Sequence, residues 1–249
     1  MPRAAIISDI HGNLEALQAV LSAIDADGAD YIVHLGDLVG YNANPRECVR
    51  LLQKKRVISV LGNHDLAILE PGMAKGFNVI AHRAIMYSQQ QLTNSEVQYL
   101  RSMPRIEVLW DKYLLCHGSP ESIESYLLNL FQTKRVFNLL RKRFAGIHLC
   151  FFGHTHVQKL WMCDPRGKVI SPPDLSDSIT LNTENLYLIN PGSVGQPRQR
   201  DNRAHYLLFD TNSEAVHFRA VAYDLAKAQR KILRANLPEY LAHRLQDGI

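Results

Sequence analysis

The feature that most constrains this chain is a series of short apolar runs, each followed at once by polar side chains that bind metals. The first run, residues 4–7, is bounded by Arg3 and leads directly into Asp9 and His11. Short, partly β-branched runs of this kind are typical of buried strands. Apolar residues at helical spacing follow over residues 14–24. A strand followed by a helix predicts an α/β sheet, with Asp9 and His11 at the carboxyl end of its first strand.

The same pattern recurs further along the chain. Strands are predicted at 31–35, 57–61, 113–116 and 147–152, and the polar residues that follow them are Asp37, Asn63 with His64, His117, and His154 with His156. Polar side chains at the carboxyl ends of strands in packed sheets are expected to meet at one edge of the molecule. The sequence therefore predicts one site built from five separated segments.

The 249 residues are predicted to form one domain, residues 1–249, in which residues 67–102 are a helical cap insertion. A helix-start pattern at 93–96 and apolar repeats on either side of it indicate helices there. Plain packing of these helices on the sheet is an equally weighted alternative to a cap over the site. His82 lies in this segment and is placed where it could reach the site.

Composition narrows the class of protein. A hydrophobic content of 46%, a charged content of 21% and a net charge of +4 are ordinary for a folded globular protein, and no nucleic-acid-binding domain is indicated. The 4 cysteines share no C-x-x-C spacing, which favours a reduced protein. No apolar run has the length of a signal peptide or a membrane span, so we expect a cytoplasmic protein without a membrane partner.

The chemistry of the clustered residues indicates metal-dependent catalysis. The donors are all nitrogen and oxygen, which suits Mn, Fe, Co, Ni or Zn, and they are too many for one tetrahedral ion. Two ions that share a carboxylate lower the pKa of a bridging water and hold both oxygens of an in-line displacement at phosphorus. The sequence therefore predicts two divalent metal ions, with manganese favoured, and hydrolysis of phosphoesters by a metal-bridging hydroxide.

The ordered motifs D-x-H, G-D, G-N-H-D, H-G and G-H-T-H resemble those of the calcineurin-like metallophosphoesterase superfamily, over roughly residues 4–220. The resemblance implies a four-layer α/β/β/α sandwich of two mixed sheets. It also implies the metal ligands: Asp9, His11 and His156 for one ion, Asn63, His117 and His154 for the other, and Asp37 as the bridge. His64 is then left to bind the phosphate or to assist at the leaving-group oxygen, with Asp65 either orienting it or capping a helix.

Within that superfamily, the element over residues 36–41 is most similar to a branch of bacterial phosphodiesterases. The phosphoprotein phosphatases of the family carry an Asp-Arg pair where this chain has Gly40 and Tyr41. We therefore expect small phosphodiesters or dinucleoside polyphosphates as substrates, with Tyr41 and Arg198 as candidate substrate-binding residues. A phosphomonoester or phosphoprotein phosphatase and a nuclease of the same superfamily are alternatives. A scaffold without activity is disfavoured, because every expected ligand is present.

Overall fold

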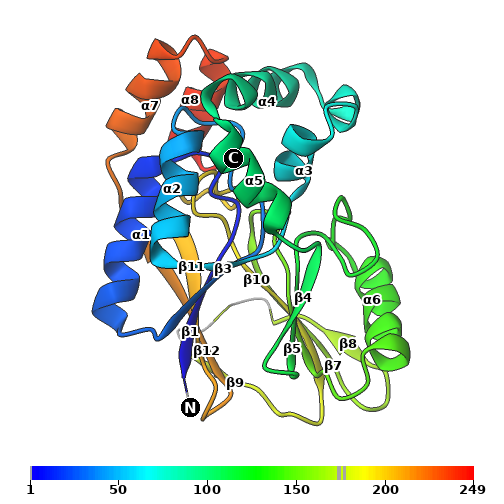
Figure 1. The fold of residues 1–249 in the computed structure, drawn as a ribbon. Helices are drawn as coiled ribbons and strands as arrows, with labels where there is room; N and C mark the ends of the chain where they lie inside the picture. Colours follow the sequence, from blue (N-terminus) through cyan, green and yellow to red (C-terminus); the bar gives the residue numbers. More distant parts are fainter. Residues whose placement is uncertain (1, 173–174, 176–177) are drawn as a thin grey trace.

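The computed structural model describes residues 2–172, 175 and 178–249. Two six-stranded sheets pack face to face, and helices cover the outer face of each (Figure 1). The helices gather mainly beside the first sheet, while a single long helix lies along the second. This is the predicted α/β/β/α sandwich with two mixed sheets.

The first sheet has the strand order β3-β2-β1-β11-β12-β9. Its strands are β3 (Ile58–Ser59), β2 (Tyr31–His34), β1 (Arg3–Ile7), β11 (Ala204–Asp210), β12 (Ala215–Val221) and β9 (Ile179–Thr180). Strands β1, β2 and β3 are parallel, and the pairs β1–β11, β11–β12 and β12–β9 are antiparallel. The carboxyl ends of β1 and β2 therefore open at the same edge.

The second sheet has the strand order β4-β5-β6-β10-β7-β8. Its strands are β4 (Ile106–Leu109), β5 (Tyr113–Cys116), β6 (Leu149–Phe151), β10 (Leu186–Pro191), β7 (Gln158–Cys163) and β8 (Val169–Ile170). Its central strands β5, β6 and β10 are parallel, whereas β4, β7 and β8 pair antiparallel to their neighbours. The carboxyl ends of β5 and β6 also open at one edge.

The helices form two outer layers. The larger layer contains α1 (Leu14–Asp27), α2 (Pro45–Lys55), α3 (Asn63–Leu69), the 3₁₀ turn η1 (Met73–Gly76), α4 (Val79–Gln91), α5 (Asn94–Ser102), α7 (Leu225–Arg234) and α8 (Glu239–Asp247). Helix α6 (Leu130–Arg143) packs alone on the second sheet. None of the helices within the described residues is long and apolar enough to cross a membrane.

Three apolar layers hold the sandwich together. Between the sheets, Ile6, Leu207 and Phe209 of the first sheet share a buried cluster with Phe151 and Ile189 of the second. A second cluster lies between the first sheet and its helices, and a third between the second sheet and α6. Burial of apolar surface is the main favourable term in folding. Both sheets are thus fixed against each other below the edge where the polar residues emerge.

One strand is much shorter than the sequence-based prediction. The strand expected at 57–61 is only Ile58–Ser59, because the chain turns away to bring Gly62 against Asp37. A Cβ atom on Gly62 would lie 2.0 Å from the backbone nitrogen of Asp37, so only glycine fits there. The helical pattern of 67–102 is divided among the end of α3, η1, α4 and α5. Of these, α5 packs on α2 and α3, while the residues around the start of α4 face the site.

Candidate metal centre

The structure brings all seven expected metal ligands to one edge of the sandwich. Asp9 and His11 follow β1, Asp37 follows β2, His117 follows β5, His154 and His156 follow β6, and Asn63 begins α3. Every one of these residues is buried. The two sheets thus contribute side chains to the same small volume from opposite sides.

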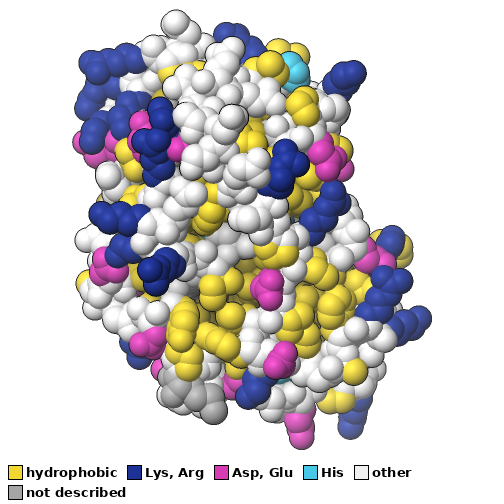
Figure 2. All heavy atoms as spheres, in the orientation of Figure 1, with side chains coloured by type: hydrophobic (Ala, Val, Ile, Leu, Met, Phe, Trp, Pro, Cys, Tyr) yellow, Lys and Arg dark blue, Asp and Glu magenta, His cyan; other side chains and the backbone are white. Residues whose placement is uncertain are grey.

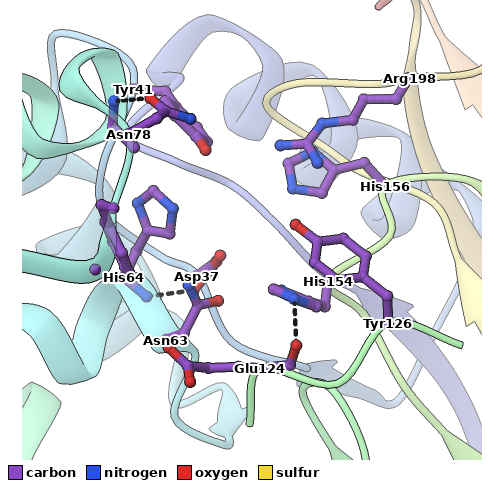
Figure 3. A pocket seen from close by; sticks show the side chains of 13 residues that line it. Asp37, Tyr41, Asn63, His64, Asn78, Glu124, Tyr126, His154, His156 and Arg198 are labelled. Carbon is purple, nitrogen blue, oxygen red and sulfur yellow. Dashed lines mark hydrogen bonds between the residues drawn. The ribbon is translucent and has the colours of Figure 1, made fainter. Parts of the chain in front are cut away.

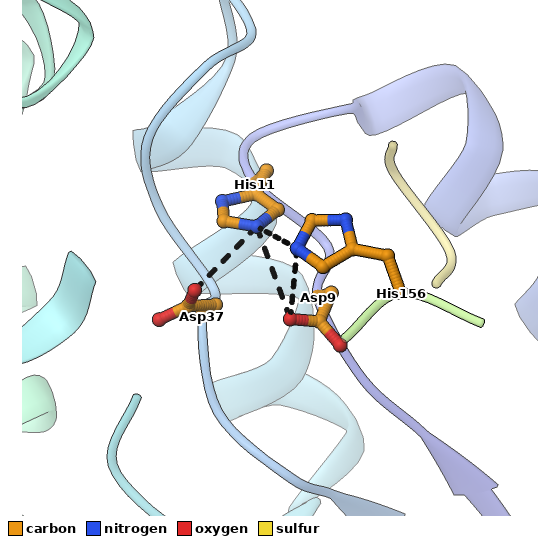
Figure 4. Close-up of side chains that lie close together, drawn as sticks. All are labelled: Asp9, His11, Asp37 and His156. Carbon is orange, nitrogen blue, oxygen red and sulfur yellow. Dashed lines mark hydrogen bonds and ion pairs between the residues drawn. The ribbon is translucent and has the colours of Figure 1, made fainter. Parts of the chain in front are cut away.

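Four of these side chains form what we call the first ligand group: Asp9, His11, Asp37 and His156. The Nε2 atoms of His11 and His156 lie 3.2 Å apart, and Asp9 Oδ1 is 3.3 Å from His156 Nε2 (Figure 4). Asp37 Oδ2 is 3.5 Å from His11 Nε2. These contacts place four potential ligand atoms around one point.

The second ligand group contains Asp37, Asn63, His117 and His154. Around His117 Nε2 lie Asn63 Oδ1 at 3.1 Å, His154 Nδ1 at 3.2 Å and Asp37 Oδ2 at 3.3 Å. The oxygen Asp37 Oδ2 therefore belongs to both groups. One carboxylate oxygen that faces two sets of ligand atoms has the geometry of a bridging ligand.

Backbone carbonyls fix which nitrogen of each histidine faces the centre. In each histidine the ring nitrogen that points away from the centre donates to a backbone carbonyl. His11 Nδ1 donates to Val39 O (3.0 Å), His117 Nδ1 to Leu35 O (2.7 Å), His156 Nδ1 to Gln196 O (2.6 Å) and His154 Nε2 to Glu124 O (3.2 Å). In a neutral ring that nitrogen carries the proton, so the other one presents a lone pair to the cluster. Metal-binding histidines are oriented in this way by their outer hydrogen bonds.

The donor set fits divalent cations. Burial lowers the pKa of His11 and of His156 well below the ordinary value and lowers that of His154 to about 3, so these rings are neutral at neutral pH. Neutral nitrogens 3.2 Å apart, each with its proton on the far side, direct two lone pairs at each other. Asp9 Oδ1 also has no hydrogen-bond donor among the described residues. A cation between these atoms satisfies all of them.

Electrostatics favour positive charge at the same place. Burial raises the pKa of Asp9 to about 7. Burial also acts to raise the pKa of Asp37, but the neighbouring His117 and His64 hold it well below the ordinary value. For His117, burial is outweighed by the Asp37 and Asp9 carboxylates, and its pKa rises to about 10. The carboxylates thus attract a proton to the cluster, and a divalent ion would be attracted more strongly.

The backbone around the centre is strained. Six of its non-glycine residues have φ between +47° and +66°, namely Asp9, His11, Asp37, Tyr41, His154 and His156. A left-handed conformation costs a non-glycine residue about 1–3 kcal/mol, and such residues gather at functional sites. Favourable packing elsewhere in the fold must offset that free-energy cost.

Asp65 supports the loop after β2, and no hydrogen bond within the described residues joins its carboxylate to the His64 ring. Its Oδ1 accepts hydrogen bonds from the backbone nitrogens of Leu38 (2.9 Å) and Val39 (3.1 Å), and its Oδ2 accepts one from Gly62 (3.0 Å). Of the two roles expected for Asp65, the helix cap is the one the structure shows. His64 donates its backbone N–H to Asp37 Oδ1 at 2.8 Å, which holds the shared carboxylate in place.

The cluster opens into a cavity of about 240 Å³. His64, Tyr41 and Arg198 line it together with several ligands, and their side chains surround the space above Asp37 (Figure 3). The Tyr41 ring lies 4.5 Å from that of His11 and 4.6 Å from that of His64, measured between centroids. Burial lowers the pKa of His64 to about 4. The two candidate substrate-binding residues therefore do reach the site.

The sequence did not indicate four further residues that line the cavity: Phe77, Asn78, Glu124 and Tyr126. Two come from the segment before α4 and two from the loop before α6, where the sequence carries no catalytic motif. The Tyr126 ring packs at 4.0 Å from that of His154, centroid to centroid. The one sequence signal for Tyr126 is its position in the loop that follows the His117 motif. His82 does not line the cavity.

A sequence model of the calcineurin-like phosphoesterase superfamily domain matches residues 3–214. The chain belongs to this superfamily. Membership implies that it is a phosphoester hydrolase, and the superfamily depends on divalent metal ions. The cluster described above is the part of this calcineurin-like phosphoesterase that could bind them.

Three individual proteins are similar to this chain over nearly its whole length. An uncharacterized protein from Methanocaldococcus jannaschii is 38% identical over 246 residues, which is 97% of this chain and 96% of that protein. The crystal structure of a metallophosphoesterase from Sphaerobacter thermophilus is 37% identical, with a TM-score of 0.83 over 100% of this chain and 99% of that one. A hypothetical protein from Pyrococcus horikoshii, 20% identical, shares the fold with a TM-score of 0.80 over 100% of this chain and 99% of its own.

Proposed function

We propose that this protein is a phosphodiesterase that uses two divalent metal ions to hydrolyse small phosphodiesters or dinucleoside polyphosphates. The observation that carries the proposal is the shared oxygen, Asp37 Oδ2, which lies 3.5 Å from His11 Nε2 and 3.3 Å from His117 Nε2. When bound there, two ions would activate water and stabilise the charge on the phosphoryl oxygens. Manganese is the ion that we favour.

The remaining polar side chains of the cavity would act on the phosphate. His64 faces the cavity from the first turn of α3, and its ring packs against the rings of His11, Tyr41 and Phe77. Its Nδ1 is buried against Gly40, where a Cβ atom would lie 2.4 Å from it, and has no hydrogen-bond partner within the described residues. The other ring nitrogen, Nε2, is therefore the one that would donate a hydrogen bond to a phosphoryl or leaving-group oxygen.

Arg198 would provide the positive charge at the other side of the cavity. Its backbone nitrogen donates to His156 O at 3.2 Å, and its guanidinium donates to Gln196 Oε1 at 3.1 Å. Its Nε finds no acceptor in the part of the chain that the structure describes. A guanidinium held at one end by its own loop is well placed to bind a phosphate oxygen.

The size and charge of the cavity favour a small diester. Its volume of about 240 Å³ is below the roughly 300–1,000 Å³ of typical sites for drug-sized ligands. A phosphodiester carries one negative charge, so a single arginine and the metals would suffice, whereas a phosphoserine carries about two. Gly40 stands where the phosphoprotein phosphatases carry the first residue of their Asp-Arg pair. No side chain fits at this position here, because a Cβ atom on Gly40 would lie 2.4 Å from His64 Nδ1.

With manganese present, we expect a higher kcat/KM for bis-p-nitrophenyl phosphate than for a phosphoserine peptide. Arg198→Ala should lower turnover of the diester, because one phosphate contact is lost, and Arg200→Ala, which removes an exposed arginine of the same loop, should not. Steady-state kinetics of the three proteins on both substrates would measure this. A preference for the phosphopeptide that disappears in Arg198→Ala would contradict the proposal and favour the phosphatase alternative.

A further inference from the structure

A second cavity lies beside the candidate metal centre. It has a volume of about 380 Å³, within the range of small-molecule sites, and lies between the loop after β5 and the first turns of α6. Tyr126 lines both this cavity and the one above Asp37. A ligand with its phosphate at the metal centre could therefore extend past Tyr126 without crossing the body of the protein.

Large apolar side chains are exposed to solvent at the rim of this second cavity. Phe131 is 81% exposed and Tyr126 is 43% exposed, and both line the cavity. Leu128 and Leu130 are also exposed, at 62% and 49%, but neither of them lines the cavity. An exposed apolar cluster next to a polar cavity is a common sign of a binding site.

Hydrogen bonds hold the rim in place. Glu124 O accepts from His154 Nε2 at 3.2 Å, which ties the loop to a candidate metal ligand. Asn129 and Gln132 form a capping box at the start of α6, with Asn129 Oδ1 accepting from Gln132 N at 3.0 Å. Phe131, in the first turn of α6, is therefore presented from a capped helix.

Polar side chains line the same cavity as the two aromatic rings, and this combination suits a flat heterocycle. The side-chain NH₂ group of Gln132 has no acceptor within the described residues, because its oxygen alone serves the helix cap. The Arg135 side chain is paired with Glu121 at 3.0 Å across the same cavity. Lys134 and Lys142 lie alongside, and Figure 2 shows lysine and arginine side chains on the outer side of α6. Such a surface would also attract a polyanion.

We infer that the cavity between Tyr126 and Phe131 binds the nucleobase of a substrate whose phosphate lies at the metal centre. Phe131 supplies a stacking surface, and Gln132 supplies a hydrogen-bond donor to the edge of the base. The substrate is then a nucleotide derivative such as a dinucleoside polyphosphate. This inference rests on the proposed phosphodiesterase function.

Saturation-transfer NMR of the zinc-loaded protein would test the site without catalysis, with a methylene-bridged, uncleavable analogue of diadenosine tetraphosphate as the probe. We expect saturation to reach the adenine protons in the wild type and to be lost in Phe131→Ala. Leu130→Ala is the matched control, since Leu130 is exposed in the same helical turn but does not line the cavity. It should behave as the wild type.

Kinetics provide the second measurement. Phe131→Ala should lower kcat/KM for diadenosine tetraphosphate about 5- to 160-fold, which corresponds to the roughly 1–3 kcal/mol that stacking of a base on an aromatic ring contributes. Hydrolysis of bis-p-nitrophenyl phosphate should change much less. Normal transfer to adenine in Phe131→Ala, or none in the wild type, would overturn the subsite. If the wild type did not hydrolyse the diester at all, the proposed function would be overturned instead, and the NMR result would still decide whether the subsite exists.

Discussion

Asp37→Asn is expected to abolish turnover and to lower the occupancy of both metal sites. The substitution removes the negative charge from Oδ2, which lies 3.5 Å from His11 Nε2 in the first ligand group and 3.3 Å from His117 Nε2 in the second. The fall in rate should exceed the roughly 10- to 100-fold that accompanies loss of a residue that only supports a ligand. Metal content per chain and hydrolysis of bis-p-nitrophenyl phosphate would measure the two effects.

Asp9→Asn provides the matched comparison. Asp9 is also a fully buried carboxylate, but the histidine side chains near it, those of His11 and His156, belong to the first ligand group. Its contact with His154 is a hydrogen bond from the backbone nitrogen at 3.2 Å, not from the ring. This variant should lose mainly one of the two ions, whereas Asp37→Asn should weaken both. If Asp37→Asn retained two tightly bound ions and a normal rate, Asp37 would not be the bridge.

His64→Ala is expected to leave both ions bound and to slow hydrolysis by ~10²–10⁴, the usual cost of removing a positioned proton donor. The His64 ring faces the cavity and contacts the rings of His11 and Tyr41, but its nitrogens belong to neither ligand group. Rates on diesters with good and poor leaving groups, together with metal analysis, would measure the effect. The loss should be largest for poor leaving groups.

The control for this variant is His82→Ala. His82 is a histidine of α4 that does not line the cavity, so its removal should leave both metal content and rate unchanged. A drop in metal content in His64→Ala would show that His64 is itself a ligand. The division of the site into two ligand groups and a substrate-facing histidine would then be wrong.

The fold could be predicted because its signal is local and repeated. Each buried strand is a short apolar run, and the polar residues that follow β1, β2, β5 and β6 emerge at strand ends, where an α/β fold exposes its crevice. The ordered motifs also resemble those of the calcineurin-like superfamily, and this resemblance implied the two-sheet sandwich. The seven ligand residues could be selected for the same reason, since each one belongs to a motif.

Other parts of the site could not be predicted, because they depend on contacts between distant segments. The carbonyl of Glu124 orients His154, and that of Gln196 orients His156, yet a backbone carbonyl leaves no mark in the sequence. Tyr126 and Phe77 enter the cavity from segments without a motif. The support that Asp65 gives to the loop after β2 depends on how Leu38 and Val39 lie, which spacing alone does not fix.

The most direct test of the two-metal site is a crystal structure of the manganese-loaded protein measured at the manganese absorption edge. We predict two anomalous peaks about 3.5–4 Å apart, one within each ligand group, with Asp37 Oδ2 between them. The four histidines should bind through His11 Nε2, His117 Nε2, His156 Nε2 and His154 Nδ1. A single peak, or peaks away from Asp37, would contradict the account.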